Sequence, residues 1–251
     1  MPNWIKNKIL VGKPEFMAEL KKRYEGNEGF DFNKVIPMPD GLDVECGSKG
    51  DDGLMLYMAK INPKCSFYGT KEDKVSEVEY KKLLKNINSH LLMNKITRMT
   101  KKEVAELSSC YKDKIGEVIA LGQKMVTNVK NYGSINWYDW SIKNWGTKWN
   151  SSETIWEEKD VIFETAWEPA LPVVMELSKQ NPKMRIALLY SDEGIGNHVG
   201  YMLLTGGHVD YEGTFPDQSR DAYKLAFDLW GCGDEYRYDN KKGRYVYNKQ
   251  Q

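Results

Sequence analysis

The residues best suited to chemistry lie in one short block, Asn144-Trp145-Gly146-Thr147-Lys148-Trp149-Asn150. Its indole, ammonium and amide groups could stack a nucleobase and neutralise a phosphate. We therefore predict a ligand-binding surface made of Trp140, Asn144, Trp145, Lys148, Trp149, Asn150, Trp167 and Glu193. The structural alternative is that Trp145 and Trp149 share the buried face of a strand, with Gly146 at a bulge and the two asparagines in turns.

A second candidate is the acidic turn Ser191-Asp192-Glu193-Gly194, which follows an apolar run of strand length. Carboxylates at the end of a central strand could bind a metal ion or a hydroxyl group. A Ca²⁺ or Mg²⁺ site, however, needs several convergent oxygen ligands, and no partners occur at a suitable spacing. A solvated turn is the favoured interpretation.

The histidines His90, His198 and His208 belong to no metal-binding motif. His198 and His208 could face each other across a hairpin, but two ligands do not make a zinc site. The glycine-rich stretch 194–200 lacks the following helix that a dinucleotide-binding loop requires. No nucleophile motif is present either. We expect no catalytic residue, no metal and no cofactor.

Composition excludes several classes of protein. The 36 basic and 36 acidic residues balance, so no global field attracts nucleic acid or an anionic membrane. The four cysteines are far apart and form no C-x-x-C pair, which predicts reduced thiols in a cytosolic compartment. Neither a signal peptide nor an apolar run of about 20 residues is found, so we expect a cytoplasmic protein without a membrane span.

The first half of the chain reads as a strand over 4–11, a helix opened by Pro14, and loops that include residues 40–52. Over residues 73–130 charged residues become dense, and apolar residues recur at the spacing of a helix. A weaker helix is predicted over 76–94. A capping box of Thr100 and Glu103 begins the most secure helix, whose apolar residues continue to Met125.

The second half is rich in tryptophan over 136–167, which favours strands, the clearest at 161–167. A helix opens at Pro169 and Pro172, and the apolar run 184–190 predicts a central strand. Gly206-Gly207 predicts a hairpin between strands at 198–205 and 208–211. A helix over 217–230 and a second hairpin follow.

This order matches a split β-α-β arrangement and predicts an α+β, ferredoxin-like antiparallel sheet with helices on one face. The predicted core is discontinuous, covering residues 1–72 and 131–214. Residues 73–130 would form a helical-hairpin insertion, and residues 215–251 a C-terminal helix and hairpin extension.

Several segments together resemble the YubB-type ferredoxin-like domain family of phages and plasmids. They are the opening MPNW-x-x-N, the segment FDFNKVIPMP, the NWGTKWN block, Thr165-Ala166-Trp167 with its following prolines, and Asp192-Glu193-Gly194. The resemblance implies a fold and a mobile-element origin, and it supplies no catalytic residues. The chain departs from the family pattern at Glu168 and Ala170.

These observations favour a non-enzymatic binding protein of a phage or plasmid, which would counter host defence by capturing a host protein or a nucleotide ligand. A single-stranded nucleic-acid-binding protein is the alternative, since an antiparallel sheet with aromatic residues can stack bases. It would need a basic patch around Lys143, Lys148 and Lys159. A metal-dependent nucleotide or phosphodiester enzyme is the third possibility, and it would need Asp192 and Glu193 to converge with a histidine.

Overall fold

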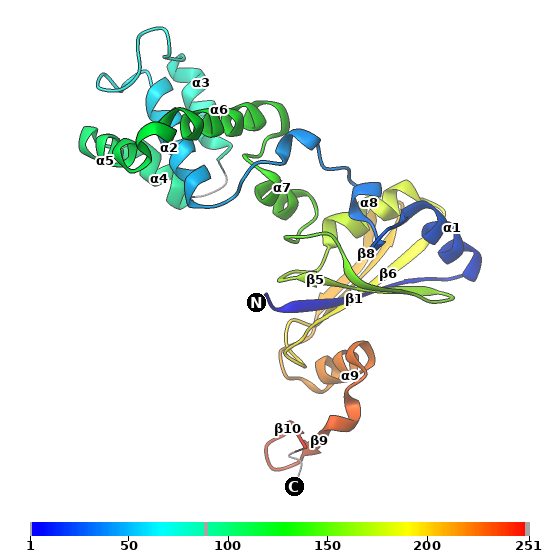
Figure 1. The fold of residues 1–251 in the computed structure, drawn as a ribbon. Helices are drawn as coiled ribbons and strands as arrows, with labels where there is room; N and C mark the ends of the chain where they lie inside the picture. The colour runs from blue at the N-terminus through cyan, green and yellow to red at the C-terminus, as the bar shows by residue number, and fades with distance from the viewer. Residues whose placement is uncertain (1, 88–89, 249–251) are drawn as a thin grey trace. The chain divides into compact units, whose positions relative to one another are not determined.

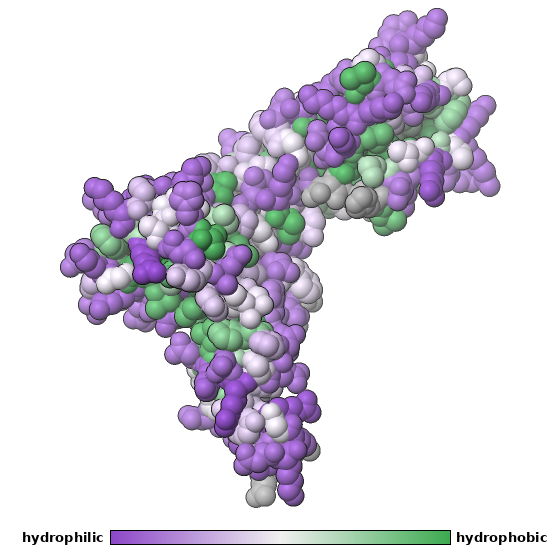
Figure 2. All heavy atoms as spheres, turned by 180° about the vertical axis from the view of Figure 1, so that it is seen from behind, coloured by the Kyte–Doolittle hydropathy of each residue, from purple (hydrophilic) through white to green (hydrophobic). Residues whose placement is uncertain are grey.

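The computed structural model describes residues 2–87 and 90–248. It divides into two compact units, one formed by Met1–Pro37 with Ser141–Gln251 and the other by Met38–Trp140. Within the described residues, no helix is long and apolar enough to cross a lipid bilayer. Hydrophilic side chains cover most of the face drawn in Figure 2, with small apolar patches between them.

The first unit is built on a six-stranded antiparallel sheet with the strand order β4-β5-β1-β6-β7-β8. The strands are β1 (Trp4–Val11), β4 (Ser152–Trp156), β5 (Asp160–Ala166), β6 (Arg185–Asp192), β7 (Gly200–Thr205) and β8 (His208–Thr214). Strands β4, β5, β1 and β6 lie in the order of a split β-α-β fold, and the β7–β8 hairpin extends it beyond β6. The predicted α+β, ferredoxin-like class is confirmed, as are the central strand and the Gly-Gly hairpin.

One face of this sheet is apolar and carries two helices, α1 (Pro14–Tyr24) and α8 (Leu171–Gln180) (Figure 1). Every second residue of β1, from Ile5 to Val11, is buried, as expected for a strand with one covered face. Burying an aliphatic side chain of this size stabilises the fold by roughly 1.5–3 kcal/mol. The helix opened by Pro169 and Pro172 was correctly predicted.

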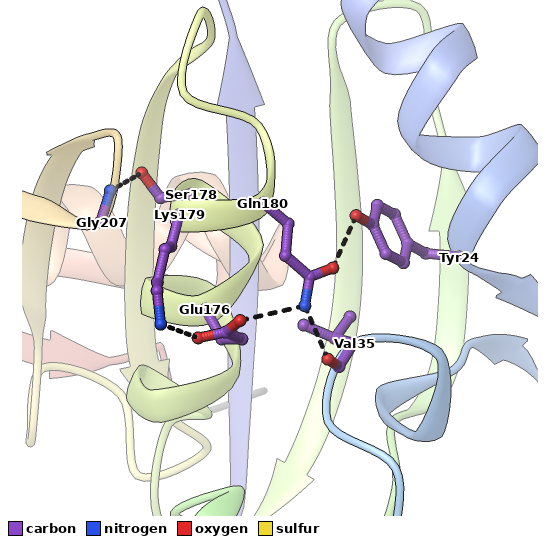
Figure 3. Close-up of polar contacts among 7 residues, drawn as sticks. All are labelled: Tyr24, Val35, Glu176, Ser178, Lys179, Gln180 and Gly207. Atoms are coloured by element: carbon purple, nitrogen blue, oxygen red, sulfur yellow. Dashed lines mark hydrogen bonds and ion pairs between the residues drawn. The ribbon is translucent and has the colours of Figure 1, made fainter.

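Polar side chains hold α8 in place at its C-terminal end (Figure 3). The Gln180 amide group donates to the backbone oxygen of Val35 over 2.9 Å and accepts from the Tyr24 hydroxyl over 3.0 Å. The Ser178 hydroxyl accepts from the backbone N–H of Gly207, in the β7–β8 turn, over 3.1 Å. These bonds connect α8 to α1, to the following loop and to the hairpin.

The opposite face of the sheet carries α9 (Arg220–Trp230) (Figure 1). The Lys6 ammonium group lies 4.2 Å from the centre of the Trp230 ring, and the Lys8 ammonium group lies 3.8 Å from the Asp228 carboxylate. The terminal hairpin of β9 (Tyr236–Asp239) and β10 (Arg244–Tyr247) packs its tyrosine rings on α9, with Tyr245 5.1 Å from Tyr223. This C-terminal region thus contributes a layer to the first unit.

The second unit is helical. It contains α2 (Ser48–Ile61), α3 (Glu77–Lys85), α4 (His90–Arg98), α5 (Lys101–Tyr111) and α6 (Ile115–Tyr132), and α7 (Trp137–Asn144) begins within it. The helices α2 and α6 pack closely at Gly53 and Gly122, because a Cβ atom on Gly122 would lie 1.9 Å from the Gly53 oxygen. The predicted insertion 73–130 lies within this unit, which begins at Met38 and ends at Trp140.

Short pieces complete the chain: β2 (Glu25–Gly26), β3 (Gly29–Phe30), and 3-10 turns at Phe32–Lys34, Asp40–Leu42, Lys112–Lys114 and Gly233–Glu235.

Four local predictions were wrong. Residues 48–52, predicted as loop, begin helix α2. The helix that starts at the confirmed Thr100–Glu103 capping box ends at Tyr111, because Lys112 has a φ of 39° and a new helix starts at Ile115. The tryptophan-rich segment begins with helix α7 and a loop, and its strands start only at Ser152. The single helix predicted over 76–94 is α3 followed by the start of α4, and its residues 88–89 lie outside the described residues.

Candidate functional site

The NWGTKWN block forms the loop between α7 and β4, and the structure separates its residues into a buried and an exposed group. Trp145 is only 4% exposed; its Nε1–H donates to the Ile36 oxygen over 3.0 Å and its ring meets Phe32 edge to face. Trp140 is buried in the helical unit. Neither indole can stack a ligand that arrives from solvent, so we remove both from the candidate surface. The structural alternative for Trp145 holds for its burial, although the residue lies in a loop and not in a strand.

The two asparagines of the block also have structural positions. Asn150 accepts from the backbone N–H of Phe32 and donates to the Asp31 carboxylate, each over 2.8 Å. Asn144 is half-buried at the end of α7. We therefore assign Asn150 to fixing the loop that carries Phe32, and ligand contact by Asn144 stays a prediction.

The centre of the block is pressed against the segment that leads into α8. Gly146 has a φ of 80°, and a Cβ atom there would lie 2.7 Å from Cδ of Pro172. The Thr147 hydroxyl donates to the backbone oxygen of Ala166 over 2.8 Å. Only glycine combines this φ with this close approach. The loop thereby turns Lys148 and Trp149 towards the surface.

Exposed aromatic rings gather around the first residues of β1. Trp149 is 39% exposed, and its ring lies 6.2 Å from the Trp4 ring. The Lys148 ammonium group lies 4.2 Å from the centre of the Trp149 ring. Trp167 is 50% exposed, and its backbone N–H donates to the Asn3 oxygen. The Glu193 N–H donates to the Trp4 oxygen. We call Trp4, Lys148, Trp149, Trp167 and Glu193 the tryptophan surface.

The acidic turn after β6 is closed by its own side chain. Asp192 is buried; its carboxylate accepts from the backbone N–H of Gly194 over 2.6 Å and from the Asn3 amide over 3.3 Å. Glu193, the next residue, is exposed. Among the described residues, the side chains of His, Cys, Asp and Glu form no group of three or more that could hold a metal ion.

Sequence reasoning missed the pairing of a histidine with a glutamate beside this surface. The His198 Nε2 atom lies 3.6 Å from the Glu168 carboxylate, and the His198 ring meets Tyr190 edge to face at 5.7 Å. The predicted pairing of His198 with His208 is wrong, because His208 pairs with Thr205 at the far end of β7. Trp167 and His198 both have a positive φ, which is uncommon for residues other than glycine and is often retained at functional sites.

The helical unit contains a separate groove of about 530 Å³ between α2, α4 and α5. Apolar side chains from three helices line it, together with two basic and two acidic residues: Met55, Leu91, Met99, Leu107, Lys95, Arg98, Glu103 and Glu106. The basic residues belong to α4 and the acidic ones to α5. Nothing in the structure shows what would cover this groove.

Comparison with known proteins supports the fold and gives no reaction. Residues 144–232 match the family model described as the ferredoxin-like domain in Api92-like protein. The chain is also similar to the crystal structure of a protein api92 from Yersinia pseudotuberculosis, with 12% sequence identity, a TM-score of 0.40, and coverage of 86% of this chain and 99% of that chain. No curated protein matches. The segment from the NWGTKWN block to Cys232 is thus similar to the ferredoxin-like domain of Api92-like proteins.

Proposed function

We propose that this chain is a binding protein that captures a protein partner at the tryptophan surface. The observation that carries the proposal is the exposure of Trp149 and Trp167 around the start of β1. Exposed indoles supply large, rigid contact areas, and tryptophan is among the residues that contribute most to binding energy in protein interfaces. The backbone N–H of Trp167 is held by the Asn3 oxygen and the Trp149 ring packs on Trp4, so little ordering is required when a partner binds.

The charges around this surface favour a protein over a phosphate-rich ligand. Lys148 contributes one ammonium group. Glu168 and Glu193, both exposed, contribute carboxylates on the adjoining turns. Carboxylates repel phosphate groups and attract basic side chains. A partner with basic and apolar residues fits this pattern.

The origin and biological role are part of the same proposal. The sequence resembles YubB-type proteins of phages and plasmids, and capture of a host protein in the host cytoplasm is one way in which a mobile element counters host defence. We therefore propose that this chain acts in counter-defence by capturing its partner. The fold similarity to Api92-like proteins is compatible with this proposal and does not specify a partner.

Binding of a nucleotide or single-stranded nucleic acid is the second candidate, because the Lys148 ammonium group lies over the Trp149 ring. A base stacked on that ring would place a phosphate near the ammonium group. The supporting basic patch is not assembled, however. Lys159 bonds to Val11 at the end of β1, whereas Trp149 lies near Trp4 at its beginning. Helix α9 also occupies part of the sheet face that an RNA-recognition domain would use.

The test is quantitative capture from host lysate with the full chain and the double variant Trp149→Ala/Trp167→Ala. Any protein enriched by the wild type is then purified, and its dissociation constant is measured for both chains. We expect at least tenfold weaker binding by the double variant, with an unchanged circular dichroism spectrum. Tyr211→Ala, which removes an exposed ring from β8, is the matched control and should bind normally.

Two results would contradict this proposal. The first is a partner that binds the double variant as tightly as the wild type. The second is a rise in the midpoint of thermal unfolding when signalling nucleotides or oligonucleotides are added, seen with the wild type and absent from the double variant. A ligand that binds the native state raises that midpoint. The second result would establish the nucleotide alternative, and a steep loss of oligonucleotide affinity with salt would identify nucleic acid.

A further inference from the structure

A small pocket of about 230 Å³ lies beside β6, β7, β8 and the start of α8. Its lining consists of Leu171, Tyr190, Tyr201, Met202, Glu212, Gly213 and Thr214. Tyr190 pairs with Gly200, Gly200 with Thr214, and Met202 with Glu212. Directly paired residues of neighbouring strands point to the same face, and so do alternate residues of one strand. Tyr190, Met202, Glu212 and Thr214 therefore project from the face that carries α8.

Tyr190 is the buried polar group of this pocket. The residue is only 6% exposed, but its hydroxyl is not among the enclosed polar atoms of the described residues that lack a partner, so the hydroxyl reaches solvent in the pocket. The absence of a side chain at Gly200 leaves the space that the hydroxyl occupies. A ligand in the pocket can therefore donate a hydrogen bond to this hydroxyl, and a ligand that covered it without doing so would leave it unsatisfied.

Two carboxylates lie near Tyr190. Glu212 lines the pocket, and Glu168 lies 3.6 Å from His198, whose ring packs against Tyr190. Burial and the negative charges of Glu168 and Glu212 raise the pKa of Tyr190 above its ordinary value. The pocket therefore combines a hydrogen-bond acceptor, negative charge and the apolar side chains of Leu171 and Met202.

We propose that this pocket binds the guanidinium group of an arginine side chain. A guanidinium group carries several N–H donors, which can reach both the Tyr190 hydroxyl and the Glu212 carboxylate. Leu171 and Met202 pack against the methylene stem of the arginine. The inference rests on the proposed function, since it names a side chain that the protein partner presents next to the tryptophan surface.

Other ligand classes fit less well. A phosphate group would be repelled by Glu168 and Glu212. A purely apolar group would leave the Tyr190 hydroxyl without a hydrogen bond and would bury the Glu212 carboxylate without a counter-charge. The pocket thus favours a ligand that is both cationic and a hydrogen-bond donor.

The experiment uses the full chain labelled with ¹³C at Cζ of tyrosine, with N-acetyl-arginine amide as the probe and N-acetyl-citrulline amide as its uncharged analogue. The resonance of Tyr190 is assigned from the spectrum of Tyr190→Phe. We expect a saturable shift of this resonance with the arginine probe and none with the citrulline probe. Glu212→Gln should weaken arginine binding about fivefold to tenfold, because a charge pair is lost. Glu158→Gln, in the exposed turn between β4 and β5, is the matched control and should not change it.

The proposal is overturned if the arginine probe causes no saturable shift, if citrulline binds equally well, or if Glu212→Gln has no effect. Thr214→Val, which changes the shape of the pocket wall very little and keeps its charge, should retain binding within about twofold. Arginine binding in a chain whose partner capture is insensitive to Trp149 and Trp167 would uphold this site and reject the proposed function. Partner capture that depends on Trp149 and Trp167, in a chain that does not bind the arginine probe, would reject the arginine site alone.

Discussion

The hydroxyl of Tyr190 lies directly over the backbone of Gly200 on the neighbouring strand. A Cβ atom at position 200 would lie 2.3 Å from the Tyr190 oxygen, well inside van der Waals contact. Strand pairing fixes both backbones, so the ring cannot be displaced without disturbing β6 or the pocket. This contact explains why a central part of the sheet contains a glycine whose φ is not positive.

Gly200→Ala should therefore lower the free energy of unfolding by about 1–3 kcal/mol, the usual cost of overpacking a filled site. Chemical denaturation of the purified variant measures this change. Adding Tyr190→Leu should recover part of the loss, because the smaller side chain removes the clash. Fully additive effects of the two substitutions would show that the two residues do not interact as the structure indicates.

Trp145 and Trp149, four residues apart, are expected to respond very differently to truncation. Trp145→Ala removes a buried ring that packs on Phe32 and donates to the Ile36 oxygen, so we expect a loss of about 3–5 kcal/mol in the free energy of unfolding. Trp149→Ala should cost less than about 1 kcal/mol, because the ring is partly exposed. Urea denaturation distinguishes the two, and equal losses would show that Trp149 belongs to the core and not to a binding surface.

Two glycines of helix α6 allow a matched test of close helix packing. A Cβ atom on Gly122 would lie 1.9 Å from the Gly53 oxygen, whereas one on Gly116 would meet no atom within 4 Å. Gly122→Ala should force α2 and α6 apart and lower the thermal midpoint of the helical unit. Gly116→Ala should leave it unchanged or raise it, since alanine is favoured over glycine in a helix by up to about 1 kcal/mol. Equal effects would contradict the packing of α2 on α6.

Sequence patterns predicted most of the sheet because each strand has a simple local signature. The apolar run before Asp192, the Gly206-Gly207 turn and the alternation from Trp4 to Val11 all correspond to observed strands. The start of helix α2 was missed because Gly50 was taken as a loop residue. Its real role is close packing, as a Cβ atom on Gly50 would lie 2.7 Å from the Glu45 oxygen and 2.7 Å from Cε of Met125. A single sequence does not distinguish a glycine that permits a turn from one that permits close contact.

The candidate site was predicted only in part, for a reason of topology. Trp167 and Glu193 lie beside Asn3 and Trp4 because β5 and β6 both pair with β1, and Trp149 packs on the Trp4 ring. No local pattern reports that pairing. The burial of Trp140 and Trp145 was equally hidden, since an indole suits a core and an exposed surface. No sequence pattern indicated that Tyr190, Glu168 and His198 lie together. The positive φ of His198 marks this place, but only the structure reveals it.

The buried tyrosine of helix α3 makes the stability of the helical unit sensitive to alkaline pH. Burial raises the pKa of Tyr80 to about 12, and its enclosed hydroxyl has no hydrogen-bond partner among the described residues. Between pH 10 and 12 the unfolded chain loses this proton while the folded chain keeps it. The unfolded state then binds fewer protons, so the free energy of unfolding falls as the pH rises through this range.

Tyr80→Phe removes this ionisation together with an unsatisfied hydroxyl. We expect the variant to be at least as stable as the wild type at pH 8, because a buried hydroxyl without a partner costs about 1–3 kcal/mol. The advantage of the variant should grow between pH 9 and 11, since only the wild type loses stability through this group. Denaturation curves at several pH values measure the difference, with Tyr211→Phe, an exposed residue, as the control. An advantage that stays constant with pH would show that the Tyr80 hydroxyl is accessible to water in the folded protein.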